Sequence, residues 1–111
     1  MKVWTVLALL GFLMSPTLFG EEKDVLTIEN NTGFILTALY LRSTEAEEWG
    51  ENLLDIPALL NGDQALISHE SEESPTIHIR ARDKEGDTYT LWDVHSDEQS
   101  VILTLSDIDP D

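Results

Sequence analysis

Beyond its first twenty residues, the chain has no long segment in which apolar residues recur with the 3.6-residue period of a helix. It carries instead short β-prone runs, separated by turn residues at intervals of about eight to twelve positions. The runs lie at residues 25–30, 34–42, 65–68, 76–82, 88–94 and 100–107, with a shorter one at 56–60. This pattern predicts an all-β fold, a single small antiparallel β-sandwich or barrel of six to seven strands. The longest run, 34–42, is apolar on both faces and is predicted to be a central strand.

The first twenty residues have the order of a secretory signal peptide. Lys2 precedes an uncharged apolar stretch at 3–14, and a helix-breaking proline then leads to an acidic segment that begins at Glu21. The apolar stretch is shorter than the roughly 20 residues that a membrane-spanning helix needs. We therefore expect residues 1–20 to be a signal peptide that is removed on export, to a periplasm or the extracellular medium. Residues 21–111 then form one β-sandwich domain with no stable membrane span.

The charge of the chain narrows the classes of partner. It has 22 Asp and Glu residues against six Lys and Arg residues, a net charge of −16. Loss of Lys2 with the signal peptide leaves five basic residues and a net charge of −17. Such a chain repels phosphate backbones and anionic lipid surfaces, so we expect no nucleic-acid partner. The carboxylates themselves serve either solubility or a cation site.

Cysteine is absent from the chain. There is therefore no disulfide framework, no thiol nucleophile and no cysteine-ligated zinc. The 91 residues from position 21 onward must be stabilised by a hydrophobic core alone, which a chain of that length can provide.

Three acidic residues in the turn at 83–87 are weak candidates for metal ligands. Asp83, Glu85 and Asp87 alternate as at the start of a calcium-binding loop. Lys84, however, adds a positive charge there, and no bidentate carboxylate follows at a fixed distance along the chain. The alternative is an ordinary hairpin loop with its charged side chains in water.

No motif in the sequence predicts a catalytic residue or a cofactor. His69, His78 and His95 lack the short spacing of zinc ligands, and no serine lies in a nucleophile elbow. Pairs of carboxylates are too frequent in this chain to identify a general acid or base. The sequence therefore predicts a non-enzymatic interaction domain. Its alternative is a calcium-binding module or a minor hydrolase that uses carboxylates.

The run at 76–82 alternates, so His78, Arg80 and Arg82 are expected on the outer face of a strand. These three residues form the basic stripe of an acidic chain and are candidates for binding an anionic ligand. The alternative is cross-strand pairing with acidic neighbours, which contributes about 0.2–1 kcal/mol per pair.

Four aromatic side chains also have two interpretations. Tyr40, Trp49, Tyr89 and Trp92 can line a glycan-binding platform, or they can fill a small core, where each buries about 150–250 Å². We favour the core. In particular, we expect Trp49 and the pair Leu53–Leu54 to fold back from the acidic loop at 43–54 and to close the core.

Five short motifs follow one another along the chain. They are an Asn-x-Thr-Gly turn at 30–33, Leu-Tyr at 39–40, a Trp-Gly then Leu-Leu loop at 49–54, a Gly-Asp-x-Tyr-Thr hairpin at 86–90 and Leu-Thr-Leu at 103–105. In this the chain resembles a loosely defined family of small secreted bacterial β-sandwich domains, over most of residues 25–107. The resemblance implies the fold and export. It implies no mechanism, because that family has no established activity. Lys84 departs from the Asp-rich turn that the resemblance implies. The partner, a protein or a glycan, and the oligomeric state stay open.

Overall fold

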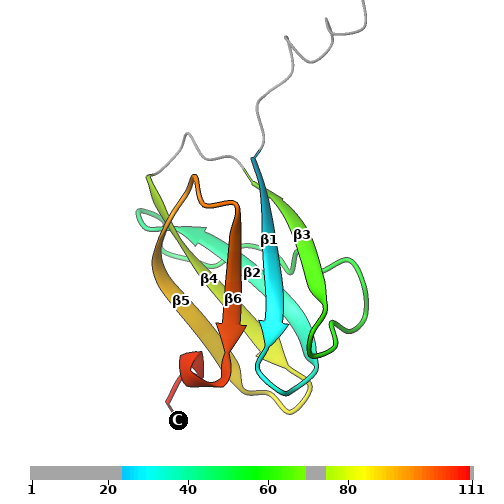
Figure 1. The fold of residues 1–111 in the computed structure, drawn as a ribbon. Helices are drawn as coiled ribbons and strands as arrows, with labels where there is room; N and C mark the ends of the chain where they lie inside the picture. Colours follow the sequence, from blue (N-terminus) through cyan, green and yellow to red (C-terminus); the bar gives the residue numbers. More distant parts are fainter. Residues whose placement is uncertain (1–23, 70–74, 111) are drawn as a thin grey trace, which may run out of the picture.

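The computed structural model describes residues 24–69 and 75–110. This part of the chain contains β1 (Asp24–Asn31), β2 (Leu36–Ser43), β3 (Gln64–His69), β4 (Thr76–Asp83), β5 (Thr88–His95), β6 (Ser100–Thr104) and the 3₁₀ turn η2 (Leu105–Asp107). The strands form two three-stranded sheets, ordered β3–β1–β6 and β2–β4–β5, which lie face to face (Figure 1). The predicted all-β fold with a sandwich architecture is confirmed. The predicted signal peptide lies outside the described residues.

One strand pair departs from the predicted antiparallel arrangement. β6 runs parallel to β1, with Ser100 opposite Thr27 and Thr104 opposite Asn31, whereas the other pairs are antiparallel. The chain crosses from one sheet to the other between β5 and β6, so β6 joins the sheet of the first strand. A turn signal in the sequence marks a reversal of the chain but not the sheet that the returning strand enters, and the prediction was wrong at this pair.

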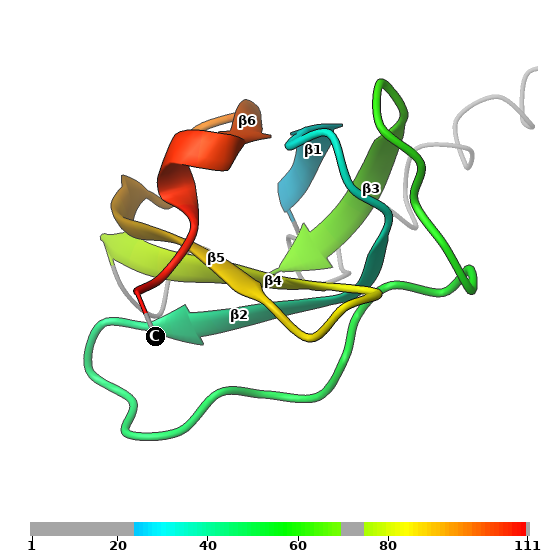
Figure 2. The same cartoon turned by 90° about the horizontal axis from the view of Figure 1, so that it is seen from below.

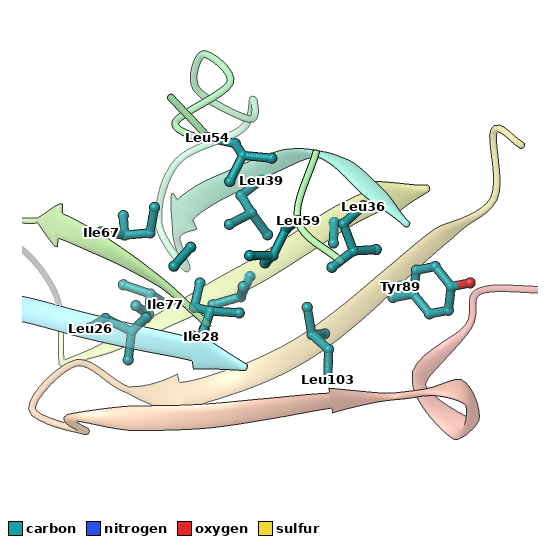
Figure 3. Close-up of a cluster of buried hydrophobic side chains, with 13 residues drawn as sticks. Leu26, Ile28, Leu36, Leu39, Leu54, Leu59, Ile67, Ile77, Tyr89 and Leu103 are labelled. Atoms are coloured by element: carbon teal, nitrogen blue, oxygen red, sulfur yellow. The ribbon is translucent and has the colours of Figure 1, made fainter. Parts of the chain in front are cut away.

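The hydrophobic core lies between the two sheets and receives side chains from every strand (Figure 3). Its thirteen buried members are Leu26, Ile28, Leu36, Leu39, Leu54, Leu59, Ala65, Ile67, Ile77, Ile79, Ala81, Tyr89 and Leu103. Most are alternate residues of a strand, as expected where successive side chains point to opposite faces of a sheet. Full burial of a Leu or Ile side chain contributes about 1.5–3 kcal/mol, which is how a core of this size holds the fold without disulfides.

β2, which lies within the run at 34–42, was predicted to be a central strand. It lies instead at the edge of its sheet, and β4 is central. The connection from β2 to β3 follows the free edge of β2 (Figure 2). The side-chain Oδ1 of Asn52 accepts the N–H of Leu39 at 2.9 Å and that of Leu54 at 3.0 Å. The N–H of Leu53 in turn donates to the C=O of Leu39 at 2.8 Å. The central-strand prediction was wrong because an irregular segment, not a second strand, shields this edge.

The turn between β1 and β2 is built around Asn30, a polar residue that is fully buried. Its Nδ2 donates to the C=O of Phe34 at 2.8 Å and of Leu59 at 2.9 Å. Its Oδ1 accepts the N–H of Thr32 at 3.0 Å and the Thr32 hydroxyl at 2.7 Å. The amide is therefore fully satisfied, and a positive φ of 88° at Gly33 completes the reversal. The Asn-x-Thr-Gly motif thus fixes a turn to the connection that carries Leu59.

Candidate functional site

All three arginines of the chain lie on the outer face of the β2–β4–β5 sheet, together with three aromatic rings. Arg42 comes from β2, and Arg80 and Arg82 come from β4, whose alternate residues Ile77 and Ile79 face the core. We call this surface the arginine–aromatic platform and define it as Tyr40, Arg42, Trp49, His78, Arg80, Arg82 and Trp92. The sequence prediction that His78, Arg80 and Arg82 share one outer face agrees with this arrangement.

Trp49 lies between two guanidinium groups of the platform. The Cζ atoms of Arg42 and Arg80 are 5.0 Å and 4.5 Å from the centroid of its ring. Arg80 also lies 6.0 Å from the centroid of Trp92, and the two indoles meet edge to face at 6.5 Å. A cation within about 6 Å of an aromatic face is attracted by the ring quadrupole. These contacts order the rings and the guanidinium groups relative to one another.

The predicted closure of the core by Trp49 is wrong. Trp49 is half-buried on the outer face of the sheet, while Leu54 enters the core and Leu53 packs against it. The loop crosses the edge of β2 between them, where the N–H of Gly50 donates to the C=O of Leu41 at 3.3 Å. Residues on the two sides of this crossing therefore reach opposite faces of the sheet. Of the four aromatic residues assigned to the core, Tyr89 alone lies in it.

His78 faces outward but is almost completely covered. A bulge at this point shifts the register between β4 and β5, and Asp93 adopts a positive φ of 57°. The N–H of Asp93 donates to Nδ1 of His78 at 3.1 Å. The imidazole also meets the Trp92 ring edge to face at 4.8 Å. His78 therefore supports Trp92 and the bulge, and it is not the exposed cationic contact that the sequence predicted.

Arg80 is held in place by the C-terminal tail. Its Nε–H donates to the hydroxyl of Thr90 at 2.9 Å, and that hydroxyl donates to Oδ2 of Asp109 at 2.7 Å. Asp109 also lies 3.7 Å from Nε of Arg80 and accepts the hydroxyl of Thr88 at 2.7 Å. Arg80 is thus partly neutralised and fixed over Trp49. The sequence reading missed Asp109, because nothing in its neighbourhood along the chain indicates that the tail reaches β5.

Among the described residues, Arg82 and Arg42 have no acidic partner comparable to Asp109. Arg82 is exposed, its Cζ lies 5.7 Å from the ring centroid of Tyr40, and its Nη1 donates to the Tyr40 hydroxyl at 3.3 Å. Nη1 of Arg42 donates to the backbone C=O of Glu47 at 3.4 Å. Within residues 24–69 and 75–110, neither guanidinium forms an ion pair with a carboxylate. A hollow of about 190 Å³ lies between Tyr40, Trp49, Arg80 and Arg82.

The weak metal candidates at 83–87 are not brought together as a cage. Asp83 is buried, and its Oδ1 accepts the backbone N–H groups of Glu85 and Asp87, both at 2.9 Å. Its Oδ2 accepts the hydroxyl of Tyr89 at 2.7 Å, and burial together with this hydrogen bond raises the pKa of Tyr89 above its usual range. Glu85 and Asp87 point into solvent. In the part of the chain that the structure describes, no three acidic, histidine or cysteine side chains are grouped to hold a metal ion.

The function of this chain has to be inferred from its own geometry, because comparisons with known proteins found no match: no protein-family model, curated protein or solved structure matches this chain. The resemblance to small secreted β-sandwich domains stays a prediction. Among the described residues, none of the helical segments has the length and apolar character needed to cross a membrane.

Proposed function

We propose that this chain is an exported, non-enzymatic interaction domain whose arginine–aromatic platform binds an anionic glycan. One observation carries the proposal. The chain has 22 acidic residues, yet its three arginines gather on one sheet face, and two of them have no ion-pair partner among the described carboxylates. Carboxylates are abundant enough that neutralising these two groups internally would be easy. Guanidinium groups that lack an ion-pair partner among the described carboxylates, gathered on one face, therefore favour recognition of an external anion.

The aromatic rings favour a sugar as the carrier of that anion. An anionic glycan offers a carboxylate or sulfate to a guanidinium and the apolar face of a sugar ring to an aromatic side chain. Trp92 is 53% exposed and lies beside Arg80, so both kinds of contact are available within one face. The planar guanidinium presents its N–H donors in a fixed fork that matches an oxyanion. A nucleic acid would place many more negative charges against a chain of net charge −16.

The arrangement gives less support to catalysis. His78 has its Nδ1 engaged by a backbone N–H and its ring edge against Trp92, so it is poorly placed as a general base. Asp83 has both carboxylate oxygens committed to its own turn and to Tyr89. No specific observation favours the calcium-binding or hydrolase alternatives.

The first test compares Arg82→Ser with Lys84→Ser. Both variants remove one exposed positive charge, but Lys84 lines a separate hollow with Phe34 and Glu85. The probe is an oligogalacturonate measured by isothermal titration calorimetry, with its methyl ester as the neutral control. Charge-assisted hydrogen bonds contribute about 1.5–3 kcal/mol, so Arg82→Ser should weaken binding at least about tenfold and reduce its salt dependence. Lys84→Ser should change the affinity less than about twofold.

Three results would contradict the proposal. Equal effects of the two substitutions would reduce the interaction to general electrostatics. Equal affinity for the acid and its methyl ester would show that the platform does not read the anion. Equal or tighter binding of a penta-glutamate peptide would assign the site to an acidic protein segment rather than to a glycan.

A further inference from the structure

A second surface, which meets the platform at Trp92, lies along the seam where β5 and β6 face each other from different sheets. Figure 1 shows the two strands side by side, and neither pairs with the other. A groove of about 420 Å³ runs between them, lined by residues 91–95, Glu98 and 100–102. β6 pairs with β1 on its other side. The seam therefore leaves one edge of β6 without a neighbouring strand among the described residues.

Within residues 24–69 and 75–110, the N–H and C=O groups of β6 that point into this groove have no partner strand. In a parallel pair, the N–H and C=O of one residue point to the same side, and successive residues alternate. The C=O of Gln99 accepts the N–H of Thr27 at 2.9 Å, so Val101 and Leu103 also point to β1. Ser100, Ile102 and Thr104 point the other way. Asp107 caps the N–H of Thr104 at 2.8 Å, and this leaves Ser100 and Ile102 without a partner strand among the described residues.

The side chains of the groove suit an extended peptide. Leu91, Val94 and Val101 are partly buried and pack against the core, so their outer surfaces line the groove with apolar area. A strand added at the edge of β6 would satisfy the free N–H and C=O groups and would cover this area with its alternate side chains. β6 also carries no charged residue or proline, the features that usually protect an exposed edge.

The charges around the groove determine which peptide fits. Asp93 and Glu98 line it, and Asp97 lies in the same connection. A second copy of this chain would bring another net charge of −16 against that rim and would be repelled. We infer that the β5–β6 groove accepts an extended basic peptide segment of a protein partner, with alternating apolar residues, by strand addition to β6. The ligand differs from that of the platform, and the groove shares Trp92 alone with the platform residues.

The test uses an eight-residue peptide of alternating Lys and Val, acetylated and amidated at its ends. Alternating Lys–Ser keeps its charge, and alternating Glu–Val keeps its apolar residues. Amide hydrogen exchange of the ¹⁵N-labelled protein, followed by NMR, reports on the edge directly. At saturation the Lys–Val peptide should slow exchange at Ser100 and Ile102 at least about tenfold, because their N–H groups become hydrogen-bonded. Neither control peptide should do so.

Two variants place the peptide on β6. Ile102→Lys and Leu66→Lys each replace an exposed apolar residue with a lysine, on the opposite edge strands β6 and β3 of one sheet. Ile102→Lys should raise the dissociation constant at least about tenfold, and Leu66→Lys should change it less than about twofold. Equal weakening, equal binding of Lys–Ser, or protection of β3 amides instead would overturn the inference. So would sedimentation showing that the free protein dimerises through β6, since a second copy would then be the occupant.

Discussion

Two arginines on the same face of one strand take different roles in this protein because their partners differ. Arg80 and Arg82 share a face of β4, but Thr90 and Asp109 hold Arg80 in place. Arg82 rests against Tyr40 and keeps its charge available. A single substitution at Arg82 therefore tests binding, whereas one at Arg80 also removes a structural contact. Replacing both arginines together would mix the two effects.

Because Trp49 lies on the outer face of the sheet, truncating its side chain should reduce the stability of the fold only moderately. Trp49→Ala should lower the free energy of unfolding by about 1–2 kcal/mol, since each cation–π contact at an exposed site contributes about 0.5–1 kcal/mol. Leu59→Ala is the matched core control and should cost about 2–5 kcal/mol, because Leu59 is completely buried. Urea unfolding followed by circular dichroism measures both. If the Trp49→Ala variant did not fold, the prediction would be contradicted, and Trp49 would have to contribute to stability as a core residue does.

The edge strands of the two sheets differ in how far other segments of the chain cover them. The connection between β2 and β3 covers the edge of β2 through Asn52, whose amide oxygen takes the place of a neighbouring strand's carbonyl. The η2 turn and the tail reach one end of β5, where Ile108 bridges to Tyr89 and the N–H of Asp109 donates to the C=O of Thr88. Among the residues that the structure describes, no strand covers the second edge of β6, which lies beside a groove. β3 is the other edge strand of this sheet, and β6 differs from it in the groove that lies beside its edge. An open edge pairs readily with other strands.

Asn52 offers a direct test of this covered edge. Asn52→Ala removes the acceptor for the N–H groups of Leu39 and Leu54, so both amides should exchange at least about tenfold faster than in the native protein. Asn52→Asp keeps an oxygen at the same place and should preserve slow exchange. Hydrogen exchange by NMR distinguishes the two. Unchanged protection in Asn52→Ala would mean that the backbone contact at Leu53 suffices to cover β2.

Across the whole molecule, the two outer sheet faces are chemically unlike. The β2–β4–β5 face carries all three arginines, whereas the exposed residues of the β3–β1–β6 face include Val25, Leu66 and Ile102. The chain thus separates its positive charge from a largely uncharged face and from acidic loops. Segregation of this kind suits a domain that meets different ligands on different sides.

Export is the prediction that concerns the chain as a whole. Expressed with its first twenty residues in a bacterial host, the protein should be recovered outside the cytoplasm and should begin at or near Glu21, because residues 1–20 have the charge and apolar order of a signal peptide. N-terminal sequencing of the exported material checks this. A variant with arginine in place of Leu9 and Leu10 should stay in the cytoplasm. Exported protein that starts at Met1 would contradict the prediction.

Local sequence determined the parts of this structure that depend on neighbouring residues. The period of two along 76–82 places Ile77 and Ile79 inside and Arg80 and Arg82 outside, since a strand turns successive side chains to opposite faces. The glycines of the tight turns likewise mark the positions where φ must be positive. The fold class, a strand number of six to seven and the outward position of Arg80 and Arg82 followed from such short-range rules.

Tertiary structure alone decided which distant segments meet. The parallel pairing of β6 with β1, the edge position of β2 and the contact of Asp109 with Arg80 join residues far apart in the chain. So does the place of Trp49, which depends on where its loop crosses β2. These pairings result from the packing of one shared core, to which all strands contribute at once. No short stretch of sequence contains that information, and for this reason the aromatic half of the platform was assigned to the core.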